Sequence, residues 1–373
     1  MIKSLYIHIP FCKRICPYCD FFKRVSSQKI MEEYKDSLIK EIELSKSHFN
    51  TLETIYIGGG TPSFYSYLKD ILVSLRDNIN LSSIKEFTIE STPETILDIK
   101  DLLKEFNINR VSIGVESFNP KTLSYLKRDS SSYEDIKYII DELKSIGINN
   151  INLDFIYGLP FETYKSIKKT LKYINKLNVS HISFYDLIIE EKTELYHDLK
   201  NKKIELMDED LNIKIKNYID YKLNKLGFNK YEISNYSKPN FESIHNLSYW
   251  NLDEYIGLGA GAHSEYDNKR YENKSDLLFY INELKNNDLS NIKIEYDFDY
   301  EKEYFLMGLR KVKGVSLSFY KEKFNIDPLI KYPKLNYFID NSILEIKNDY
   351  LRFTKKGMNL GNLVFEEFVW EDV

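Results

Sequence analysis

The only three cysteines of the 373-residue chain, Cys12, Cys16 and Cys19, lie close together near the start with the spacing C-x3-C-x2-C. Chance would scatter three cysteines over the whole chain, so this concentration indicates that one object is held by all three thiols. A disulfide would leave an odd thiol and would close only a very short loop, which gives little stabilisation. We therefore consider a metal.

Two metal objects fit three neighbouring thiols. Zinc usually takes four ligands, and His8 would complete a Cys3His site. However, His8 lies in an apparent strand at residues 5–9 and points wherever the pleat directs it. An iron–sulfur cluster is the other object, because thiolates in short cysteine runs are its usual ligands. Three thiolates on four irons would leave one iron open.

With Tyr18 before the third cysteine, the run reads C-x3-C-x-aromatic-C and resembles the signature of the radical S-adenosylmethionine (SAM) enzymes. The resemblance implies a 4Fe–4S cluster on Cys12, Cys16 and Cys19, whose open iron chelates the amino and carboxylate groups of SAM. Reductive cleavage of SAM in that family gives a 5′-deoxyadenosyl radical. The resemblance also implies an α/β fold, the partial, TIM-like (β/α)6 radical SAM barrel.

The elements that must position these cysteines follow a regular pattern. Short β-branched or aromatic runs alternate with amphipathic helical stretches, and this alternation predicts a parallel sheet covered by helices. A long helix is expected at residues 27–48, where Met31, Tyr34, Leu38, Ile42 and Leu44 fall at helical spacing. The expected strands are residues 5–9, 54–57, 86–90, 110–115, 151–156 and 181–185.

Candidate ligand contacts follow these strands, since sites in such barrels form at the carboxyl ends of the strands. Gly58-Gly59-Gly60-Thr61-Pro62 resembles the GGGTP segment of the oxygen-independent coproporphyrinogen III oxidase family. The resemblance implies that Gly59, Gly60 and Thr61 hold the amino-acid end of SAM, with Tyr6 as a further contact. We expect the backbone N–H groups of the glycines to form an anion-binding nest. A plain tight turn is the alternative.

The third and fourth strands are followed by charged candidates. Glu90 opens a segment that resembles the family's E-x-x-P-E and could accept hydrogen bonds from an ammonium or a hydroxyl. Glu116 stands where the family usually has a glutamine that contacts the SAM ribose, so it adds a charge there. Arg128 matches a family arginine near the SAM carboxylate, where a cation is electrostatically favourable. The alternative for Arg128 is a solvated surface arginine.

The remaining SAM candidates come later in the chain. Asp154, in a segment that resembles the family's D-L-I-Y-G-L-P, lies in an otherwise apolar strand and needs partners. Ribose hydroxyls or neighbouring backbone N–H groups would supply them. Asp186 occupies the place where the family's backbone brackets the adenine. His263 ends a glycine-rich run that closes over SAM in the family and contacts it through the backbone.

Three segments are expected from these motifs. Residues 1–235 would form the barrel, 236–296 a closing segment, and 297–373 a small C-terminal domain. Helical patterns at 301–312, 316–324 and 328–340 before a hairpin at 344–354 are typical of a winged-helix-like module. Because that module has no strongly basic helix, we interpret it as a lid or a partner-binding domain rather than a DNA reader.

Two features select within the family. Coproporphyrinogen oxidases carry a further cysteine two residues after the third, where this chain has Phe21. His245, Tyr249 and Trp250 form an H-N-x-x-Y-W motif that is similar to that of the haem chaperones of the HemW type. A neutral imidazole is a common ligand of haem iron, and flat aromatic rings suit the macrocycle. The alternative is a structural histidine in the barrel floor with Trp250 in the core.

The resemblance therefore predicts a chaperone that binds haem as cargo and transfers it to an acceptor protein, with the cluster and SAM gating transfer. The alternatives are an oxygen-independent coproporphyrinogen III oxidase, which decarboxylates propionates, and a zinc-stabilised barrel.

A net charge of −5 gives no electrostatic case for nucleic acid. No apolar run approaches the length of a membrane span, and the chain begins almost directly in a strand, so we expect a cytoplasmic protein. Transient membrane association during delivery is compatible with the chain.

Overall fold

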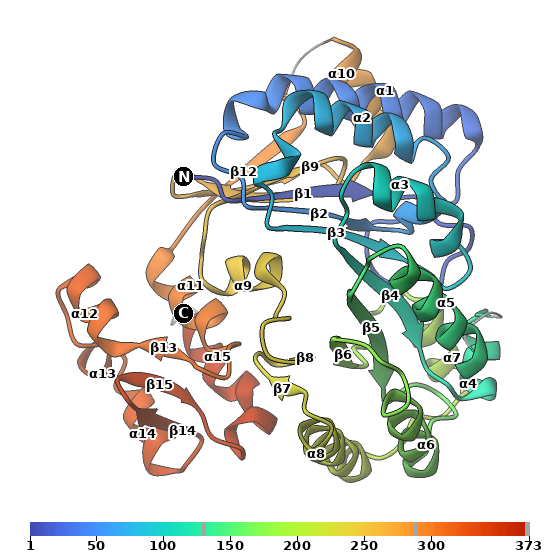
Figure 1. Ribbon diagram of the computed structural model, residues 1–373. Helices are drawn as coiled ribbons and strands as arrows, with labels where there is room; N and C mark the ends of the chain where they lie inside the picture. Colours follow the sequence, from blue (N-terminus) through green and yellow to red (C-terminus); the bar gives the residue numbers. More distant parts are fainter. Residues whose placement is uncertain (129–131, 287–288, 370–373) are drawn as a thin grey trace.

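The computed structural model describes residues 1–128, 132–286 and 289–369. Six parallel strands form the barrel wall in chain order (Figure 1), and each strand expected from the sequence is present with ends that differ by one or two residues. These strands are β1 (Ser4–Ile9), β2 (Thr54–Gly59), β3 (Glu86–Ser91), β4 (Arg110–Glu116), β5 (Asn150–Tyr157) and β6 (His181–Asp186). The partial (β/α)6 architecture is therefore confirmed.

Helices follow the strands and surround the barrel. They are α1 (Gln28–Ser45), α2 (Leu68–Asn78), α3 (Lys100–Glu105), α4 (Pro120–Tyr125), α5 (Tyr133–Ser145), α6 (Tyr164–Ile174), α7 (Glu194–Lys200) and α8 (Glu209–Lys225). Ser27 caps α1 by accepting a hydrogen bond from the backbone N–H of Ile30. The expected apolar stripe of α1 is buried except at Leu44, which is 40% exposed because it lies on the opposite side of the helix from Ile42.

The two faces of the barrel strands differ in chemistry. Side chains that point outward, such as Ile7, Ile57 and Leu153, belong to one large hydrophobic core shared with the helices. Side chains that point inward are polar and hydrogen-bond across neighbouring strands. For example, Asn152 of β5 donates to Ser112 of β4 and to Ser183 of β6, at 2.7 and 2.9 Å. Because side chains alternate between the two faces of each strand, an apolar outer layer is separated from a polar interior.

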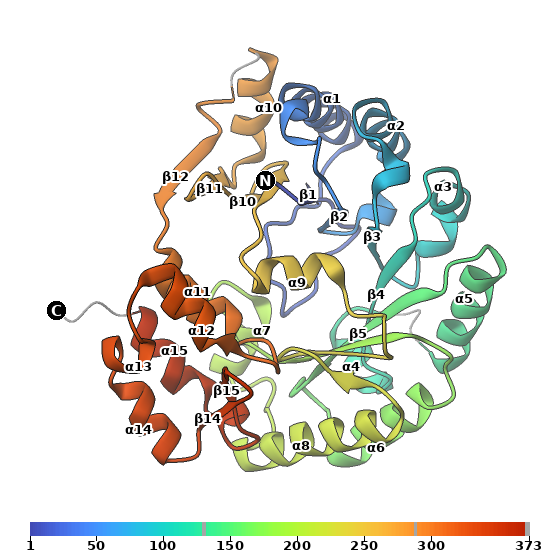
Figure 2. The ribbon, with the colours of Figure 1, turned by 60° about the vertical axis from the view of Figure 1, so that its left-hand side comes forward.

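The segment after the sixth unit extends the sheet at both edges. Its elements are β7 (Asn229–Lys230), β8 (Asn235–Ser237), α9 (Ile244–Trp250), β9 (Tyr255–Leu258), β10 (His263–Tyr266), β11 (Lys269–Asn273), α10 (Leu277–Lys285) and β12 (Lys293–Asp297). β9 pairs in parallel with β1, and β8 pairs in antiparallel fashion with β6. Figure 2 shows α9 across the middle of the ring formed by strands and outer helices.

A second, smaller hydrophobic core holds the C-terminal part together. Its elements are α11 (Tyr300–Gly308), β13 (Val315–Ser316), α12 (Leu317–Phe324), α13 (Pro328–Lys331), α14 (Lys334–Asp340), β14 (Leu344–Lys347), β15 (Tyr350–Phe353) and α15 (Gly361–Val369). The expected hairpin pairs β14 with β15. The helix expected at 328–340 is wrong as one element: it breaks before Pro333, which disfavours a helical conformation in the residue that precedes it. Residues 370–373 lie outside the described residues.

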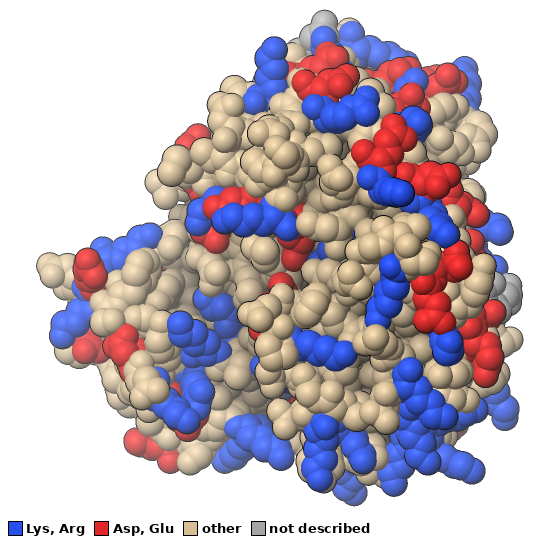
Figure 3. Space-filling model, in the orientation of Figure 1, with Lys and Arg blue, Asp and Glu red and all other residues tan. Residues whose placement is uncertain are grey.

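Surface charge is uneven although the whole chain is mildly acidic. Figure 3 shows basic and acidic side chains mixed over most of one face, with Lys and Arg gathered along the lower edge, where Figure 1 places α6 and α8. Several α6 and α8 lysines lie over tyrosine rings, including Lys168 over Tyr164 at 4.5 Å and Lys225 over Tyr221 at 4.8 Å. Among the described helices, none is both long and apolar enough to cross a bilayer.

The small core gives a test of the C-terminal fold. Phe305 is fully buried and stacks on Phe368 with 4.6 Å between ring centroids. We expect Phe305→Ala to lower the free energy of unfolding by about 3–5 kcal/mol, because it leaves a cavity in a small core. Ile330→Ala, at a residue that is 73% exposed, is the control and should change little. Equal urea midpoints for both variants would contradict the assignment of this core.

Candidate functional site

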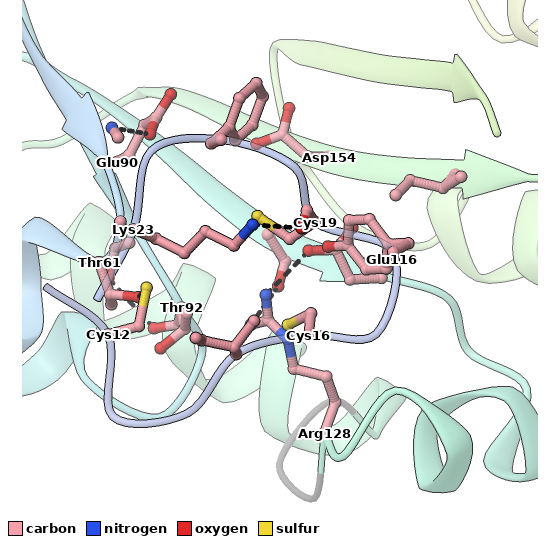
Figure 4. A pocket seen from close by; sticks show the side chains of 18 of the residues that line it. Cys12, Cys16, Cys19, Lys23, Thr61, Glu90, Thr92, Glu116, Arg128 and Asp154 are labelled. Carbon is pink, nitrogen blue, oxygen red and sulfur yellow. Dashed lines mark hydrogen bonds and ion pairs between the residues drawn. The ribbon is translucent and has the colours of Figure 1, made fainter. Parts of the chain in front are cut away.

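A cavity of about 480 Å³ opens at the carboxyl ends of the barrel strands. It falls within the range that small-molecule sites usually occupy. The cysteine loop lies along one side, and residues from the ends of β2 to β6 complete the wall (Figure 4). Of the residues predicted from the sequence, the cavity is lined by Cys12, Cys16, Cys19, Gly59, Gly60, Thr61, Glu90, Glu116, Arg128, Asp154 and Asp186.

The cysteine loop is held from within and from the barrel. The backbone N–H of Cys19 donates to the carbonyl of Cys16 at 3.1 Å, which makes a tight turn between them. Thr61 Oγ1 donates to Cys12 Sγ at 3.7 Å, and Lys23 Nζ donates to the carbonyl oxygen of Cys19. Burial raises the pKa of the Cys12 thiol and raises that of Cys19 to about 11. A bound cation would favour the thiolates, which are the forms that ligate metals.

The glycine segment at the end of β2 supports a carboxylate rather than an open anion nest. The N–H of Gly59 donates to Glu90 Oε2 at 3.0 Å, whereas those of Gly60 and Thr61 donate to the carbonyls of Ile9 and Phe11, both at 2.8 Å. The expected nest is therefore wrong, since these N–H groups are already occupied. The segment instead ties β2 to the start of the cysteine loop.

Glu90 is buried in the wall of the cavity. Its Oε1 accepts a hydrogen bond of 2.7 Å from the hydroxyl of Tyr56, in addition to the bond from Gly59. Burial raises the pKa of the Glu90 carboxyl, and these donors oppose the rise. Such a carboxyl suits a cationic ligand, which would supply the charge that the interior lacks.

Glu116 and Arg128 form a buried ion pair with 3.0 Å between Oε1 and Nη2. Glu116 adopts a left-handed conformation, with φ of 66°, at an irregularity between β4 and β5 that turns its side chain into the cavity. Burial raises the pKa of Glu116, and Arg128 opposes that rise. Arg128 is therefore not a solvated surface residue. The charge that distinguishes Glu116 from the family's glutamine is neutralised locally.

Arg128 also has a free donor. Its Nε is buried and has no hydrogen-bond partner among the described residues. Although burial opposes the guanidinium charge, Glu116 keeps the pKa of Arg128 above its ordinary value. An anionic oxygen in the cavity would satisfy this donor, as buried polar groups require.

Asp154 and Asp186 lie farther round the cavity. Asp154 accepts hydrogen bonds of 2.8 Å from both Ser112 Oγ and Asn152 Nδ2, and burial raises the pKa of its carboxyl. Asp186 is exposed and accepts from Asn212 Nδ2 at 3.0 Å. Side chains, rather than backbone N–H groups, thus satisfy Asp154. A further donor from a ligand would stabilise the charged form of this buried carboxyl.

Two predicted SAM contacts lie outside the lining of the cavity. The hydroxyl of Tyr6 hydrogen-bonds His8 Nδ1 at 2.9 Å beneath it, and His263 lies at the start of β10 with its side chain exposed. His8 Nε2 hydrogen-bonds the carbonyl of Phe22 at 2.8 Å, so both ring nitrogens of His8 are occupied. The Cys3His zinc alternative therefore loses its fourth ligand. No three Cys, His, Asp or Glu side chains of the described residues surround a single ion position.

The predicted haem contacts lie on α9, in the floor of the barrel. His245 is 1% exposed, and its Nδ1 and Nε2 hydrogen-bond Thr54 Oγ1 and the Tyr249 hydroxyl at 2.7 and 2.8 Å. Burial lowers the pKa of His245 to about 3, so the ring is neutral. Trp250 faces the C-terminal domain, where the guanidinium of Arg310 lies 5.3 Å from its ring centroid. Haem ligation by His245 would therefore require one of its hydrogen bonds to break.

Sequence reasoning missed several residues that build the cavity. Tyr56 and Lys23 line it. Tyr18, identified from the sequence only as the aromatic of the cysteine motif, also lines it, and its hydroxyl hydrogen-bonds Glu116. One signal could have found Tyr56. It lies two residues before Gly58, and residues two positions apart in a strand point to the same face, so Tyr56 would be expected to face the barrel interior with Gly58. No comparable signal was available for Lys23, because its position depends on the path of the cysteine loop.

Comparisons with known families place these features in context. The sequence model of the Radical SAM superfamily matches residues 6–174, and that of the HemN C-terminal domain matches residues 299–360. A protein of Lactococcus lactis named "Heme chaperone HemW" is 34% identical over 375 residues, which cover 100% of this chain and 98% of that protein. A HemW of Bacillus subtilis is 33% identical, with 99% and 100% covered.

Among solved structures, the coproporphyrinogen III oxidase (HemN) of Escherichia coli, described as a radical SAM enzyme, superposes with a TM-score of 0.83. The match covers 98% of this chain and 90% of the oxidase at 22% sequence identity. This likeness supports the fold of both the barrel and the C-terminal domain.

The glycine turn allows a matched test of the wall of the cavity. Gly59 has φ of 109°, and a Cβ there would lie 2.5 Å from the ring of His8, which is fixed at both nitrogens. We expect Gly59→Ala to lower the free energy of unfolding by about 2–5 kcal/mol through backbone strain and overpacking. Gly147→Ala is the control, because Gly147 has φ of 94° and open space around its Cβ position. If the two variants had the same chemical-denaturation midpoint, the close approach to His8 would be refuted.

Proposed function

Because the chain belongs to the HemW family of radical SAM proteins, we propose that it binds haem and transfers it to an acceptor protein. The identity to HemW proteins over the full length of the chain carries this proposal. The H-N-x-x-Y-W motif on α9 supports it, and so does Phe21 in place of a fourth cysteine. The acceptor would be a haem-dependent protein. A cytoplasmic location and a transient membrane contact during delivery stay predictions from the sequence.

The cavity has the donor set that a 4Fe–4S cluster and SAM require. Cys12, Cys16 and Cys19 would hold the cluster, since three thiols line one side of the cavity. When bound, the cluster supplies an iron without a protein ligand, which the amino and carboxylate groups of SAM can reach. Around it, carboxylates outnumber cations, and this suits a ligand that carries an ammonium and a sulfonium.

Each polar group of the cavity would then have a role in binding SAM. Glu90 would accept hydrogen bonds from the ammonium of SAM, and the free Nε of Arg128 would donate to its carboxylate. Asp154 and Glu116 would accept from the ribose hydroxyls. Asp186 would lie near the adenine. For Gly59, Gly60 and Thr61 we propose close packing against the amino-acid end of SAM rather than donation from their N–H groups.

Tyr6 and His263 would act on SAM only indirectly in this conformation. Tyr6 supports His8 below the cavity, and His263 follows the glycine run that packs on Phe22 of the cysteine loop. We propose that these two residues hold the cysteine loop in place and so shape the cavity. Direct backbone contact of His263 with SAM would need the glycine run to move inward.

For haem, we propose contact with His245, Tyr249 and Trp250 in a form in which the Tyr249 hydroxyl has left His245 Nε2. This nitrogen is the one that commonly ligates iron. The Nε1 of Trp250 is buried without a hydrogen-bond partner among the described residues, so it is available to a polar group of the ligand. The surrounding rings supply flat apolar faces.

This proposal predicts variants with opposite effects on haem affinity. Tyr249→Phe keeps the ring but removes the hydroxyl that competes for His245 Nε2, so haem should bind several-fold more tightly. His245→Ala should abolish the Soret shift that haem titration of the cluster-reconstituted wild type produces. Absence of a Soret shift in the wild type would overturn the chaperone proposal itself. If neither substitution changed the affinity for haem, the haem site would lie elsewhere than on α9.

A porphyrinogen oxidase is the alternative that shares the SAM motifs. An anaerobic assay of the same preparation with dithionite, SAM and coproporphyrinogen III distinguishes the two functions. The chaperone proposal expects no protoporphyrinogen. Its formation at a rate that depends on SAM would favour the oxidase.

A further inference from the structure

The motif histidine touches the wall of the cavity although it does not line it. The ring of His245 stacks on that of Tyr56 with 5.0 Å between centroids and an interplanar angle of 27°. Tyr56 itself lines the cavity. Only one aromatic ring therefore separates the floor histidine from the space that the ligand would occupy.

Tyr56 connects this contact to the carboxylate of Glu90. Its hydroxyl donates to Glu90 Oε1 at 2.7 Å, while Oε2 accepts from the N–H of Gly59 at 3.0 Å. The two oxygens are thus fixed by one donor each. A tilt of the Tyr56 ring would remove one of these donors and free the carboxylate to rotate in the cavity.

His245 cannot move easily, because a closed series of hydrogen bonds holds it. Its Nδ1 bonds Thr54 Oγ1 (2.7 Å), Thr54 donates to Ser4 Oγ (2.9 Å), Ser4 donates to Ser248 Oγ (2.8 Å), and Ser248 donates to the carbonyl of His245 (2.7 Å). Because the hydroxyl proton of Thr54 is donated to Ser4, Thr54 Oγ1 must accept from His245, and His245 Nδ1 therefore carries the N–H. Its Nε2 then accepts from Tyr249.

The backbone around His245 is anchored to the same strand that carries Glu90. Glu86 of β3 accepts hydrogen bonds from the N–H groups of Ile244 and His245, at 2.9 and 3.1 Å, and from Ser243 Oγ at 3.0 Å. Strand β3 therefore fixes α9 at one end and presents Glu90 to the cavity at the other. The histidine, the tyrosine and the carboxylate form one rigid unit.

We propose that His245 is a positioning residue for the SAM site, and that it holds Glu90 in its orientation through the ring of Tyr56. This inference rests on the proposed function only in that the cavity binds SAM. It assigns the motif histidine a role at the cavity above it, whether or not haem reaches α9. His245 would touch neither SAM nor the cluster.

The test is a double-mutant cycle on SAM affinity in the anaerobic, cluster-reconstituted full chain. His245→Ala and Tyr56→Phe should each weaken SAM binding by about tenfold at unchanged iron content, because each disturbs the hydrogen bond from Tyr56 to the buried Glu90 carboxyl. The double variant should also bind SAM about tenfold more weakly than the wild type, and not a hundredfold, because both substitutions interrupt the same contact. A purely structural lesion would not produce this non-additivity.

A second variant keeps the test decisive if His245→Ala does not fold. His245→Asn can still donate to Thr54 but has no ring to stack on Tyr56, and it should weaken SAM binding to a similar extent. Ile244→Ala, at the exposed neighbouring position of α9, controls for damage to the helix and should bind SAM like the wild type.

Two outcomes would overturn the inference: wild-type SAM affinity in the His245 variants, or losses that multiply in the double variant. Either would leave the proposed function standing, since haem titration of the wild type is a separate measurement. If the wild type bound the cluster but no SAM, the premise that the cavity binds SAM would be wrong, and so would the role proposed for His245.

Discussion

A buried carboxylate must be given hydrogen-bond donors or a cation, and the interior of this barrel is built around that requirement. Glu86 accepts from the first N–H groups of α9, and Glu90 accepts from Tyr56 and Gly59. Asp154 accepts from Ser112 of β4 and from Asn152 of its own strand, and Glu116 pairs with Arg128. Barrels of eight parallel strands and eight helices usually fill their interior with branched apolar side chains. Here the inner face is polar, and the apolar residues lie outside under the helices. A polar interior of this kind offers hydrogen-bond partners and charges to a charged ligand in the cavity.

The same interior joins two regions that are far apart in the sequence. The cysteine loop and the strand ends close the cavity at one end, whereas α9 with the H-N-x-x-Y-W motif fills the other. Within α9, His245 faces Tyr56 and the barrel, while Trp250 faces Arg310 and the C-terminal domain. One short helix therefore contacts the wall of the SAM cavity and the second domain. Because α9 carries both contacts, a substitution that displaces this helix should disturb both of them.

Much of this arrangement could be predicted from residue types and spacing. The cysteine spacing, the strand ends and the resemblance of the segments at those ends to family motifs placed most cavity residues, because a parallel sheet brings all its carboxyl ends to one edge. Their partners could not be predicted. The ion pair of Glu116 with Arg128 depends on a left-handed residue at a strand irregularity, and the N–H groups of Gly60 and Thr61 are taken by carbonyls that only the folded loop brings near. The pairing of β9 with β1 joins residues more than two hundred positions apart, and no local pattern encodes it.

The central claim is that three thiolates leave one cluster iron open to SAM at the edge of this polar interior. Electron paramagnetic resonance of the anaerobically reconstituted, dithionite-reduced protein tests it most directly, with and without SAM. We expect about four iron atoms per chain, a reduced-cluster signal whose g values change when SAM is added, and loss of that signal in Cys16→Ser. A chain that binds no iron, or a cluster whose spectrum SAM leaves unchanged, would contradict the account.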